Sequence, residues 1–210
     1  MKNKTHTVIF DLDGTLSDSA ILTMAALKTA APRFRLPMPA AEAIQRATGH
    51  SNPQFYYILF PEAPREIVFE MGQMVEQEEL RLLPTVKDSL LFEGCRELLT
   101  CLKERELSLN IASTGDNNHV FSILKETGII GLFDKISCGR PDKIEILREM
   151  TGNDKSGFIM VGDMKKDSDG ARANGVISVG ACYGYCLREL AGFDYYIDTP
   201  MELLNFLNIL

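Results

Sequence analysis

The sequence lacks the features that mark a membrane protein or a secreted one. Nowhere in its 210 residues does an apolar run approach the ~18 residues of a membrane span. Only three apolar residues, VIF, separate the N-terminal MKNKTHT from the first aspartate, too few for the hydrophobic region of a signal peptide. We therefore expect a cytoplasmic protein that does not associate with membranes.

Paired cysteine motifs and a surplus of positive charge are also missing. The five cysteines form an odd set without the Cys-x-x-Cys spacing of zinc or thioredoxin-like sites, so we expect reduced thiols in the core. The net charge of −7 disfavours general binding of nucleic acid, which usually requires a basic face. No nucleic-acid partner is expected.

The chain contains an alternation of short apolar runs and helical patterns, with an ordinary globular content of 45 % hydrophobic residues. This alternation predicts a doubly wound α/β fold, in which helices cover both faces of a parallel sheet. The predicted strands are Thr7–Phe10, Leu107–Ala112, Lys135–Cys138, Gly157–Val161, Val176–Val179 and Tyr195–Ile197, and the predicted helices of the core are Glu93–Glu104, Asn117–Thr127, Asp142–Met150 and Met201–Leu207, with a further one from Asp167 through Ala173.

Residues 19–83 interrupt this alternation. They show helical patterns at Ala20–Ala31, Ala40–Thr48 and Glu66–Leu82, separated by prolines, and contain no convincing strand. We predict an all-helical domain over 19–83, inserted into an α/β core formed by 1–18 and 84–210.

The first predicted strand runs directly into Asp11-Leu12-Asp13-Gly14-Thr15. Aspartate and glycine gather at strand ends in ordinary turns, so Asp-x-Asp alone has a plain structural explanation. The full order of apolar strand, Asp, x, Asp, Gly, Thr is a much more specific pattern than Asp-x-Asp alone. A carboxylate can approach the phosphorus of a phosphomonoester dianion only when a cation and hydrogen-bond donors offset the repulsion, which makes Mg²⁺ a natural partner.

Two further predicted strands also end in polar residues. Ser113 and Thr114 follow the second strand and can offer hydroxyl and backbone N–H groups to phosphate oxygens. Asp163 follows the fourth strand, and Asp167 stands four residues later. Because ligands of such sheets bind beyond the carboxyl ends of the strands, we expect these residues to converge with the first motif on one site.

These motifs resemble those of the haloacid dehalogenase superfamily of phosphatases, in its phosphoglycolate phosphatase-like branch with a helical cap. The branch is suggested by Asp18-Ser19 after the first motif and by Phe92-Glu93-Gly94 before the core resumes. The resemblance implies that Asp11 is the nucleophile. It also implies that Asp13 is the general acid/base and lends its backbone carbonyl to Mg²⁺. Dehalogenases of this superfamily typically lack an acid at the position of Asp13.

The resemblance assigns the remaining motif positions as well. Ser113 would be the phosphate-binding hydroxyl, with Thr114 beside it. Asp163 would ligate Mg²⁺ directly, and Asp167 would bind it through water or orient other groups.

The third motif departs from the common Lys-Pro-x-Pro pattern, since this chain has Arg140-Pro141-Asp142-Lys143. A cation must stabilise Asp11 and the phosphoryl charge, and either Arg140 or Lys143 can do so. Strict register favours Arg140. We prefer Lys143 because it begins a predicted helix and carries a compact point charge, and this leaves Arg140 as a substrate contact or a surface turn residue.

The other basic residues give weaker signals. By their spacing His6, His50 and His119 form no metal cluster, and the implied mechanism requires no histidine. We interpret His50 as part of a polar surface loop. Lys165 and Lys166, inside the fourth motif, are interpreted as surface charges.

The leading hypothesis is therefore a Mg²⁺-dependent phosphatase acting on a small phosphorylated substrate such as phosphoglycolate, a sugar phosphate or a nucleotide. One alternative is a phosphomutase of the β-phosphoglucomutase type, which returns the phosphoryl group to a sugar. Another is a noncatalytic phosphate-binding protein. We expect a monomer or a homodimer.

Overall fold

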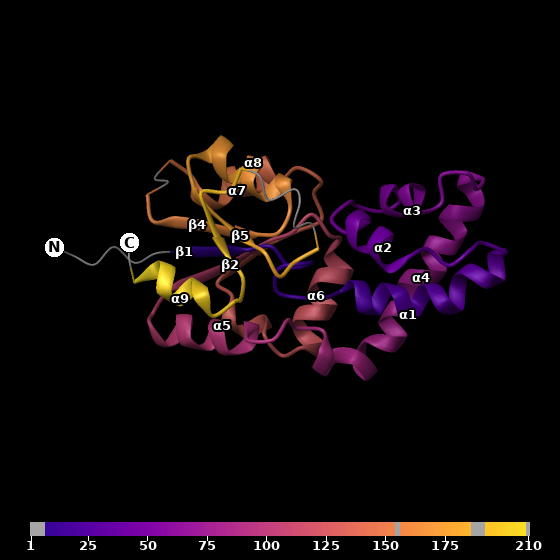
Figure 1. Cartoon of the computed structure of the whole chain (residues 1–210), viewed down its shortest axis with the longest axis horizontal. Coiled ribbons are helices and arrows are strands. Elements are labelled where there is room, and N and C mark those ends of the chain that lie inside the picture. The colour runs from indigo at the N-terminus through magenta and orange to yellow at the C-terminus, as the bar shows by residue number, and fades with distance from the viewer. Residues whose placement is uncertain (1–6, 154–155, 186–191, 209–210) are drawn as a thin grey trace.

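The computed structural model describes residues 7–153, 156–185 and 192–208. It contains an α/β core and, beside it, a helical cap built from the segment that follows the first strand (Figure 1). The predicted fold class, a doubly wound parallel-sheet core with an inserted helical cap, is confirmed.

The core is built on a six-stranded parallel sheet in the order β3-β2-β1-β4-β5-β6. Each strand begins and ends within two residues of its predicted bounds, because short apolar runs between turn signals mark buried parallel strands well. The strands are β1 (Thr7–Phe10), β2 (Ser108–Ala112), β3 (Lys135–Ser137), β4 (Phe158–Gly162), β5 (Ile177–Ala181) and β6 (Tyr195–Ile197).

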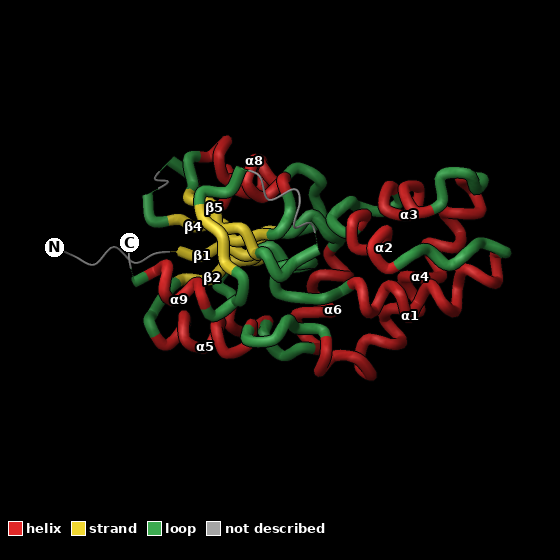
Figure 2. The backbone as a smooth tube through the Cα atoms, in the orientation of Figure 1, coloured by secondary structure: helices red, strands yellow, loops and turns green. Residues whose placement is uncertain are grey.

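Helices cover both faces of this sheet (Figure 2). Successive strand residues point to opposite faces, so Val8 and Phe10 of β1 pack in one apolar cluster and Ile9 packs in another. The cluster around Phe10 includes residues of α5 (Cys95–Glu104), α6 (Asn117–Glu126) and α9 (Glu202–Leu207), and the cluster around Ile9 includes residues of α7 (Lys143–Thr151) and α8 (Lys165–Asn174).

The cap has an apolar core of its own, centred on residues such as Leu27, Phe55 and Met71. It consists of α1 (Ala20–Ala30), α2 (Ala41–Ala47), α3 (Gln54–Leu59) and α4 (Arg65–Val86). Short 3₁₀ turns follow at Ala31–Phe34 in the cap and at Lys87–Ser89 and Ile130–Leu132 in the core.

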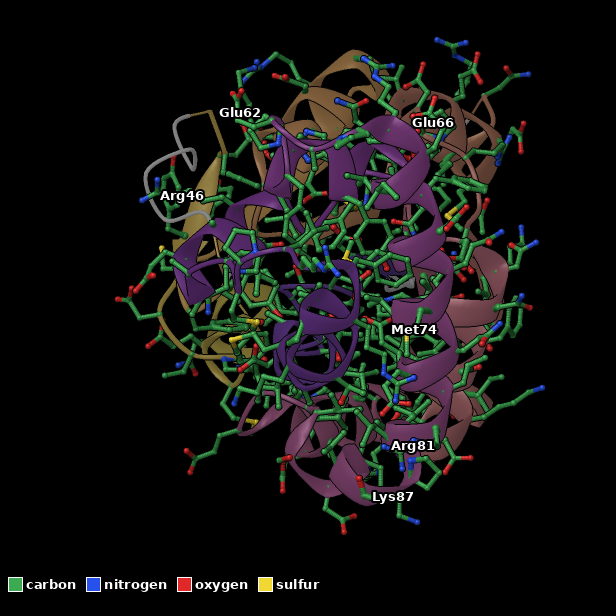
Figure 3. The ribbon with its side chains drawn as sticks, turned by 90° about the vertical axis from the view of Figure 1, so that its right-hand side faces the viewer. Arg46, Glu62, Glu66, Met74, Arg81 and Lys87 are labelled. Atoms are coloured by element: carbon green, nitrogen blue, oxygen red, sulfur yellow. The ribbon has the colours of Figure 1, made fainter. Side chains whose placement is uncertain are left out.

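Two features of the cap differ from the sequence prediction. Helix α3 was not predicted, since its six residues are too few to show a clear period. Helix α4 runs past Pro84 to Val86, because a proline so close to the end of a helix disturbs little of it. Figure 3 looks onto this helix, from Glu66 past Met74 to Arg81. Leu82 and Val86, near its end, already pack against the core.

The described residues bear on two expectations from the sequence, which concern membrane-spanning segments and the state of the cysteines. Over that part of the chain, no helix is long and apolar enough to cross a membrane. The four described cysteines are free thiols, with Cys95 buried and Cys101, Cys138 and Cys182 partly buried. Cys186 and His6 lie outside the described residues.

Candidate active site

The site forms where the carboxyl ends of three neighbouring strands meet. Strand β1 lies between β2 and β4, and Phe10 pairs in register with both Ile111 and Val161. The strands therefore end side by side, and the residues that follow them converge. Strands β2 and β3 lie on one side of β1 and strands β4 to β6 on the other, so the strand order reverses at β1 and makes this edge a topological switch point.

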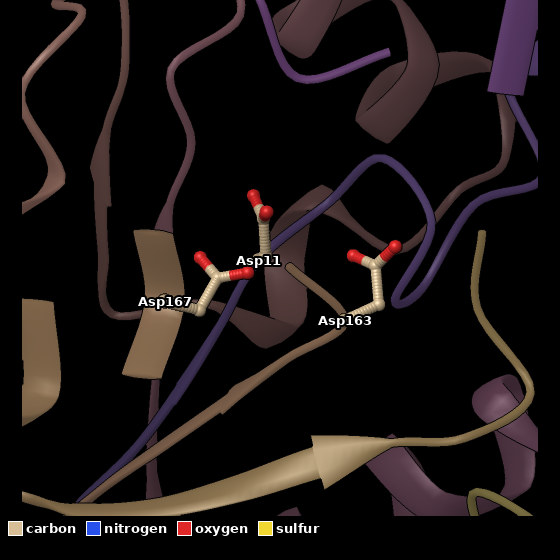
Figure 4. A group of neighbouring side chains, drawn as sticks. All are labelled: Asp11, Asp163 and Asp167. Atoms are coloured by element: carbon tan, nitrogen blue, oxygen red, sulfur yellow. The ribbon is translucent and has the colours of Figure 1, made fainter. Parts of the chain in front are cut away.

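Three carboxylates gather at this edge (Figure 4). Asp11 follows β1, Asp163 follows β4, and Asp167 lies in the first turn of α8. One oxygen atom from each lies within 4.8 Å of the others, and all three residues are buried. These residues were predicted to share a site, and the structure brings them together.

Two glycines leave the space that this arrangement needs. A Cβ atom on Gly162 would lie 2.3 Å from Cγ of Asp167, and one on Gly14 would lie 2.3 Å from Oδ2 of Asp163. Gly14 also has a φ of +82°, which favours glycine. The glycines of the first and fourth motifs therefore allow the backbone to pass close to the carboxylates.

Lys143 lies among these carboxylates. Its Nζ atom is 2.9 Å from Oδ1 of Asp11 and 2.8 Å from Oδ1 of Asp167, and the side chain is 1 % exposed. It also donates a hydrogen bond of 2.6 Å to the carbonyl of Ala112. Asp142 caps the helix that carries it, accepting from the backbone N–H of Ile144 at 2.8 Å. Burial alone would lower the pKa of Lys143, but the two carboxylates outweigh it and raise the pKa.

Arg140, the other candidate cation, lies elsewhere. Its guanidinium forms a fork with Glu149 at 2.6 and 2.8 Å and donates to Oγ of Ser137 at 2.9 Å. The structure therefore brings Lys143, and not Arg140, to Asp11.

The carboxylate cluster carries more negative charge than one ammonium can balance. Burial and the charge of Asp167 raise the pKa of Asp11 to about 6, although Lys143 opposes the shift. Burial and the charges of Asp167 and Asp11 raise the pKa of Asp163 to about 8. Several hard oxygen donors with uncompensated charge suit a divalent cation such as Mg²⁺. The residues present thus fit the metal that the resemblance implies.

The two hydroxyl residues after β2 have different surroundings. Oγ of buried Ser113 accepts from the backbone N–H of Gly115 at 3.0 Å. Thr114 donates to the carbonyl of Gly49 in the cap at 3.0 Å and accepts from Nζ of Lys166 at 2.6 Å. Lys166 also donates to Gly49 at 2.9 Å. The interpretation of Lys166 as a surface charge is wrong, because it joins the core to the cap and is only partly exposed. Exposed Lys165 instead pairs with Asp169.

Asp13, which is not part of the carboxylate cluster, contacts His119. Like the contacts of Lys166, this contact was not predicted from the sequence. Nε2 of His119 lies 2.8 Å from Oδ1 of Asp13. Burial opposes ionisation of both groups, yet each favours the charge of the other, so the pKa of Asp13 is lowered and that of His119 is raised to about 10. His119 lies in the first turn of α6, and Asp116 caps this helix by accepting from its backbone N–H at 3.0 Å.

The position of His119 in the sequence could have indicated that it lies near the site. It follows the end of β2 by a short loop, so it had to lie near the other strand ends. Nothing in the local sequence indicated that its ring points at Asp13. Lys166 has a comparable position at the start of α8, and its contact with the cap depends on packing between distant segments.

A cavity of about 370 Å³ lies between the cap and the core. Asp13, Gly115 and His119 line its core side, and exposed His50 and buried Tyr56 belong to the cap side. Nδ1 of His50 lies 3.0 Å from the carbonyl of Ala47. Asp13 therefore lies at the boundary of this cavity.

Comparisons with known proteins identify similar sequences. A model of the haloacid dehalogenase-like hydrolases matches residues 8–181. A phosphoglycolate phosphatase from Synechococcus elongatus is 29 % identical, over 94 % of this chain and 95 % of that protein.

Solved structures share the whole fold. One from Haemophilus somnus, described as a predicted phosphoglycolate phosphatase, has a TM-score of 0.82 at 20 % identity and covers 99 % of this chain and 100 % of its own. A β-phosphoglucomutase from Clostridium difficile has a TM-score of 0.78 at 18 % identity, covering 98 % and 96 %. At such identities the likeness concerns the fold alone, so it does not separate hydrolysis from transfer to a sugar.

Proposed function

The chain belongs to the haloacid dehalogenase-like hydrolase family, and we propose that it is a Mg²⁺-dependent phosphatase that hydrolyses a small phosphomonoester through an aspartyl-phosphate on Asp11. The observation that carries this proposal is the position of Asp11. It lies buried at the end of β1, 2.9 Å from Nζ of Lys143 and beside Asp163 and Asp167.

In the first half of the reaction, a carboxylate oxygen of Asp11 forms a bond to phosphorus while the bond from phosphorus to the ester oxygen breaks. The proton that His119 and Asp13 share across their 2.8 Å contact passes through Asp13 to the departing oxygen, which leaves as an alcohol. Lys143 orients Asp11 and offsets part of the charge of the phosphoryl group. Ser113 offers its hydroxyl to a phosphate oxygen, with Thr114 beside it.

In the second half, water attacks the phosphorus of the aspartyl-phosphate and Asp13 takes a proton from that water. The bond from Asp11 to phosphorus breaks, phosphate leaves, and both aspartates return to their starting states. Such proton transfer contributes roughly a hundred- to ten-thousandfold in rate. His119 holds the carboxyl group of Asp13 in place, at 2.8 Å.

Asp163 and Asp167 would hold Mg²⁺ together with Asp11 and the backbone carbonyl of Asp13. When bound, the ion supplies the positive charge that lets a carboxylate approach a phosphate dianion. Arg140 has no part in this scheme, since Glu149 already engages its guanidinium.

The proposal is tested by a phosphate-release screen over phosphoglycolate, sugar phosphates, nucleotides and pyrophosphate, with and without Mg²⁺. We expect turnover of at least one small phosphomonoester, dependent on Mg²⁺. Asp11→Asn should lower kcat by about 10⁴-fold or more, as the loss of a nucleophile does elsewhere. Asp169→Asn is the matched control, because Asp169 lies on α8 outside the carboxylate cluster, where it pairs with Lys165 and Arg172. Normal Mg²⁺-dependent turnover by Asp11→Asn would refute the mechanism.

A further inference from the structure

The charged residues that line the cavity between cap and core bear on the charge of the substrate's leaving group. If Asp11 attacks phosphorus and Asp13 protonates the ester oxygen, the rest of the substrate must lie beyond Asp13. The cavity of about 370 Å³ begins there. This step rests on the proposed function, and it makes the cavity the binding site of the leaving group.

Carboxylates dominate the ionisable residues that line this cavity. Asp13 and Asp116 come from the core, and Glu76 and Glu79 come from positions three residues apart on α4 in the cap. Among the described residues that line it there is no lysine or arginine. Beyond its two histidines, the lining therefore offers no cation to an anionic ligand.

Neither histidine removes this excess of negative charge. His119 is engaged by Asp13 at 2.8 Å, so its positive charge is already matched by one carboxylate. His50 is exposed, and its Nδ1 lies 3.0 Å from a backbone carbonyl at the end of α2. Among the described residues that line the cavity, none forms an ion pair with Asp116, Glu76 or Glu79, although the charge of His119 acts on both glutamates.

The two glutamates of α4 that line the cavity have neutral hydrogen-bond partners among the described residues. Glu79 accepts from Oγ1 of Thr23 at 2.6 Å, and Glu76 accepts from Nδ2 of Asn52 at 2.7 Å. A neutral donor orients a carboxylate without cancelling its charge. Burial raises the pKa of Glu79, and the charges of Asp13 and Glu76 add to the shift, while the charge of His119 and the hydrogen bond from Thr23 oppose it.

Glu78 lies between these two residues in the sequence but serves a different purpose. It forms an ion pair with Arg81 at 2.6 Å and does not line the cavity. Arg81 is thus paired away from the cavity, while Glu76 and Glu79 line it without an ion pair to any described residue.

We propose that Glu76 and Glu79 select the leaving group by its charge, and that the substrates are monophosphates of alcohols bearing an ammonium group or, less well, only hydroxyl groups. An anionic leaving group would be placed against like charges, an arrangement that is strongly unfavourable in a partly desolvated site. The alcohol released from phosphoglycolate carries a carboxylate, so phosphoglycolate is a poor substrate for this chain, in contrast to what the names of its relatives suggest.

Three substrates of nearly equal size test this proposal: O-phosphoethanolamine, 2-hydroxyethyl phosphate and 2-phosphoglycolate. They share two carbons and differ in carrying an ammonium, a hydroxyl or a carboxylate. We expect kcat/KM with Mg²⁺ to fall in that order, with at least about a tenfold difference between the first and the last. Glu79→Gln and Glu76→Gln should each reduce the ratio of kcat/KM for phosphoethanolamine to that for phosphoglycolate by at least about fivefold.

Glu78→Gln is the control, since it removes the same charge from the same helix outside the cavity; it should leave this ratio unchanged. A wild-type preference for phosphoglycolate, or a ratio unaffected by both Glu79→Gln and Glu76→Gln, would overturn the charge-selection proposal while leaving the phosphatase intact. Absence of Mg²⁺-dependent hydrolysis of all three substrates, of p-nitrophenyl phosphate and of every phosphomonoester in the phosphate-release screen would instead refute the proposed function, and this inference with it.

Discussion

At the scale of single residues, the two aspartates of the first motif face different surroundings. Asp11 belongs to the carboxylate cluster with Lys143, whereas Asp13 pairs with His119 at the edge of the cavity. The proposed division of labour between nucleophile and acid/base thus coincides with two different electrostatic environments, although the residues are only two positions apart.

His119 is expected to act by positioning Asp13. His119→Ala should lower kcat about 10- to 100-fold for an alkyl phosphate, because its leaving oxygen needs a proton from Asp13. The loss should be much smaller for p-nitrophenyl phosphate, whose phenolate leaves without help. His119→Gln, which keeps a hydrogen-bond donor, should recover part of the rate. Equal losses for both substrates would show that His119 is merely structural.

Lys143 and Arg140 give the second prediction at this scale. Lys143→Met should abolish measurable turnover, because it removes the ammonium beside Asp11, whereas Arg140→Met should keep most of it. Removing one member of a buried ion pair also leaves uncompensated charge, so the free energy of unfolding of Lys143→Met without metal should fall by about 3–5 kcal/mol in urea titrations. The opposite ranking of the two variants would assign the third-motif role to Arg140.

At the scale of elements, apolar runs predicted all six strands of the described sheet. Parallel strands that are buried on both faces consist almost entirely of apolar residues, so each one appears in the sequence as a short apolar run. The site residues that follow these strands could be predicted as well, because the topology brings the carboxyl ends of β1, β2 and β4 to one edge of the sheet. Helix α3 and the contacts of His119 and Lys166 could not be found in this way. They depend on how cap and core pack, and no local period carries that information.

The close approach of β4 to α8 at Gly162 gives a prediction for these elements. Gly162→Ala should disturb Asp167 and lower both Mg²⁺ affinity and stability, the latter by about 1–3 kcal/mol, because its Cβ would overlap a buried, hydrogen-bonded carboxylate. Gly131→Ala is the matched control, as its Cβ would meet nothing within 4 Å. Isothermal titration with Mg²⁺ and urea unfolding measure the two effects. A Gly162→Ala protein with wild-type Mg²⁺ affinity would contradict this account.

At the scale of the whole molecule, stability should depend on pH and metal together. Since the pKa of Asp163 is raised to about 8 by burial and by neighbouring carboxylates, the folded protein without metal binds a proton that the unfolded chain releases near pH 4. Stability without metal should therefore be lost as the pH rises from about 4 to 8. Mg²⁺ must displace this proton, so its binding is favoured at the upper end of the range.

The expected result is a larger increase in Tm on adding Mg²⁺ at pH 8.5 than at pH 6, measured by differential scanning fluorimetry. Asp163→Asn should show little increase at either pH and a higher Tm than the wild type without metal at pH 8.5, since one repelling charge is gone. A Tm increase that is equal at both pH values, or larger at pH 6, would contradict the account of the cluster.

The central claim is that phosphate passes through Asp11, and the most direct test is to trap that intermediate. The enzyme is mixed with Mg²⁺ and its best phosphomonoester, quenched in acid within the first turnover, digested, and analysed by mass spectrometry. We predict a phosphoryl group on the peptide containing Asp11, absent in Asp11→Asn and in the sample without Mg²⁺. Rapid turnover with no phosphoryl group on Asp11, together with activity retained by Asp11→Asn, would contradict the claim.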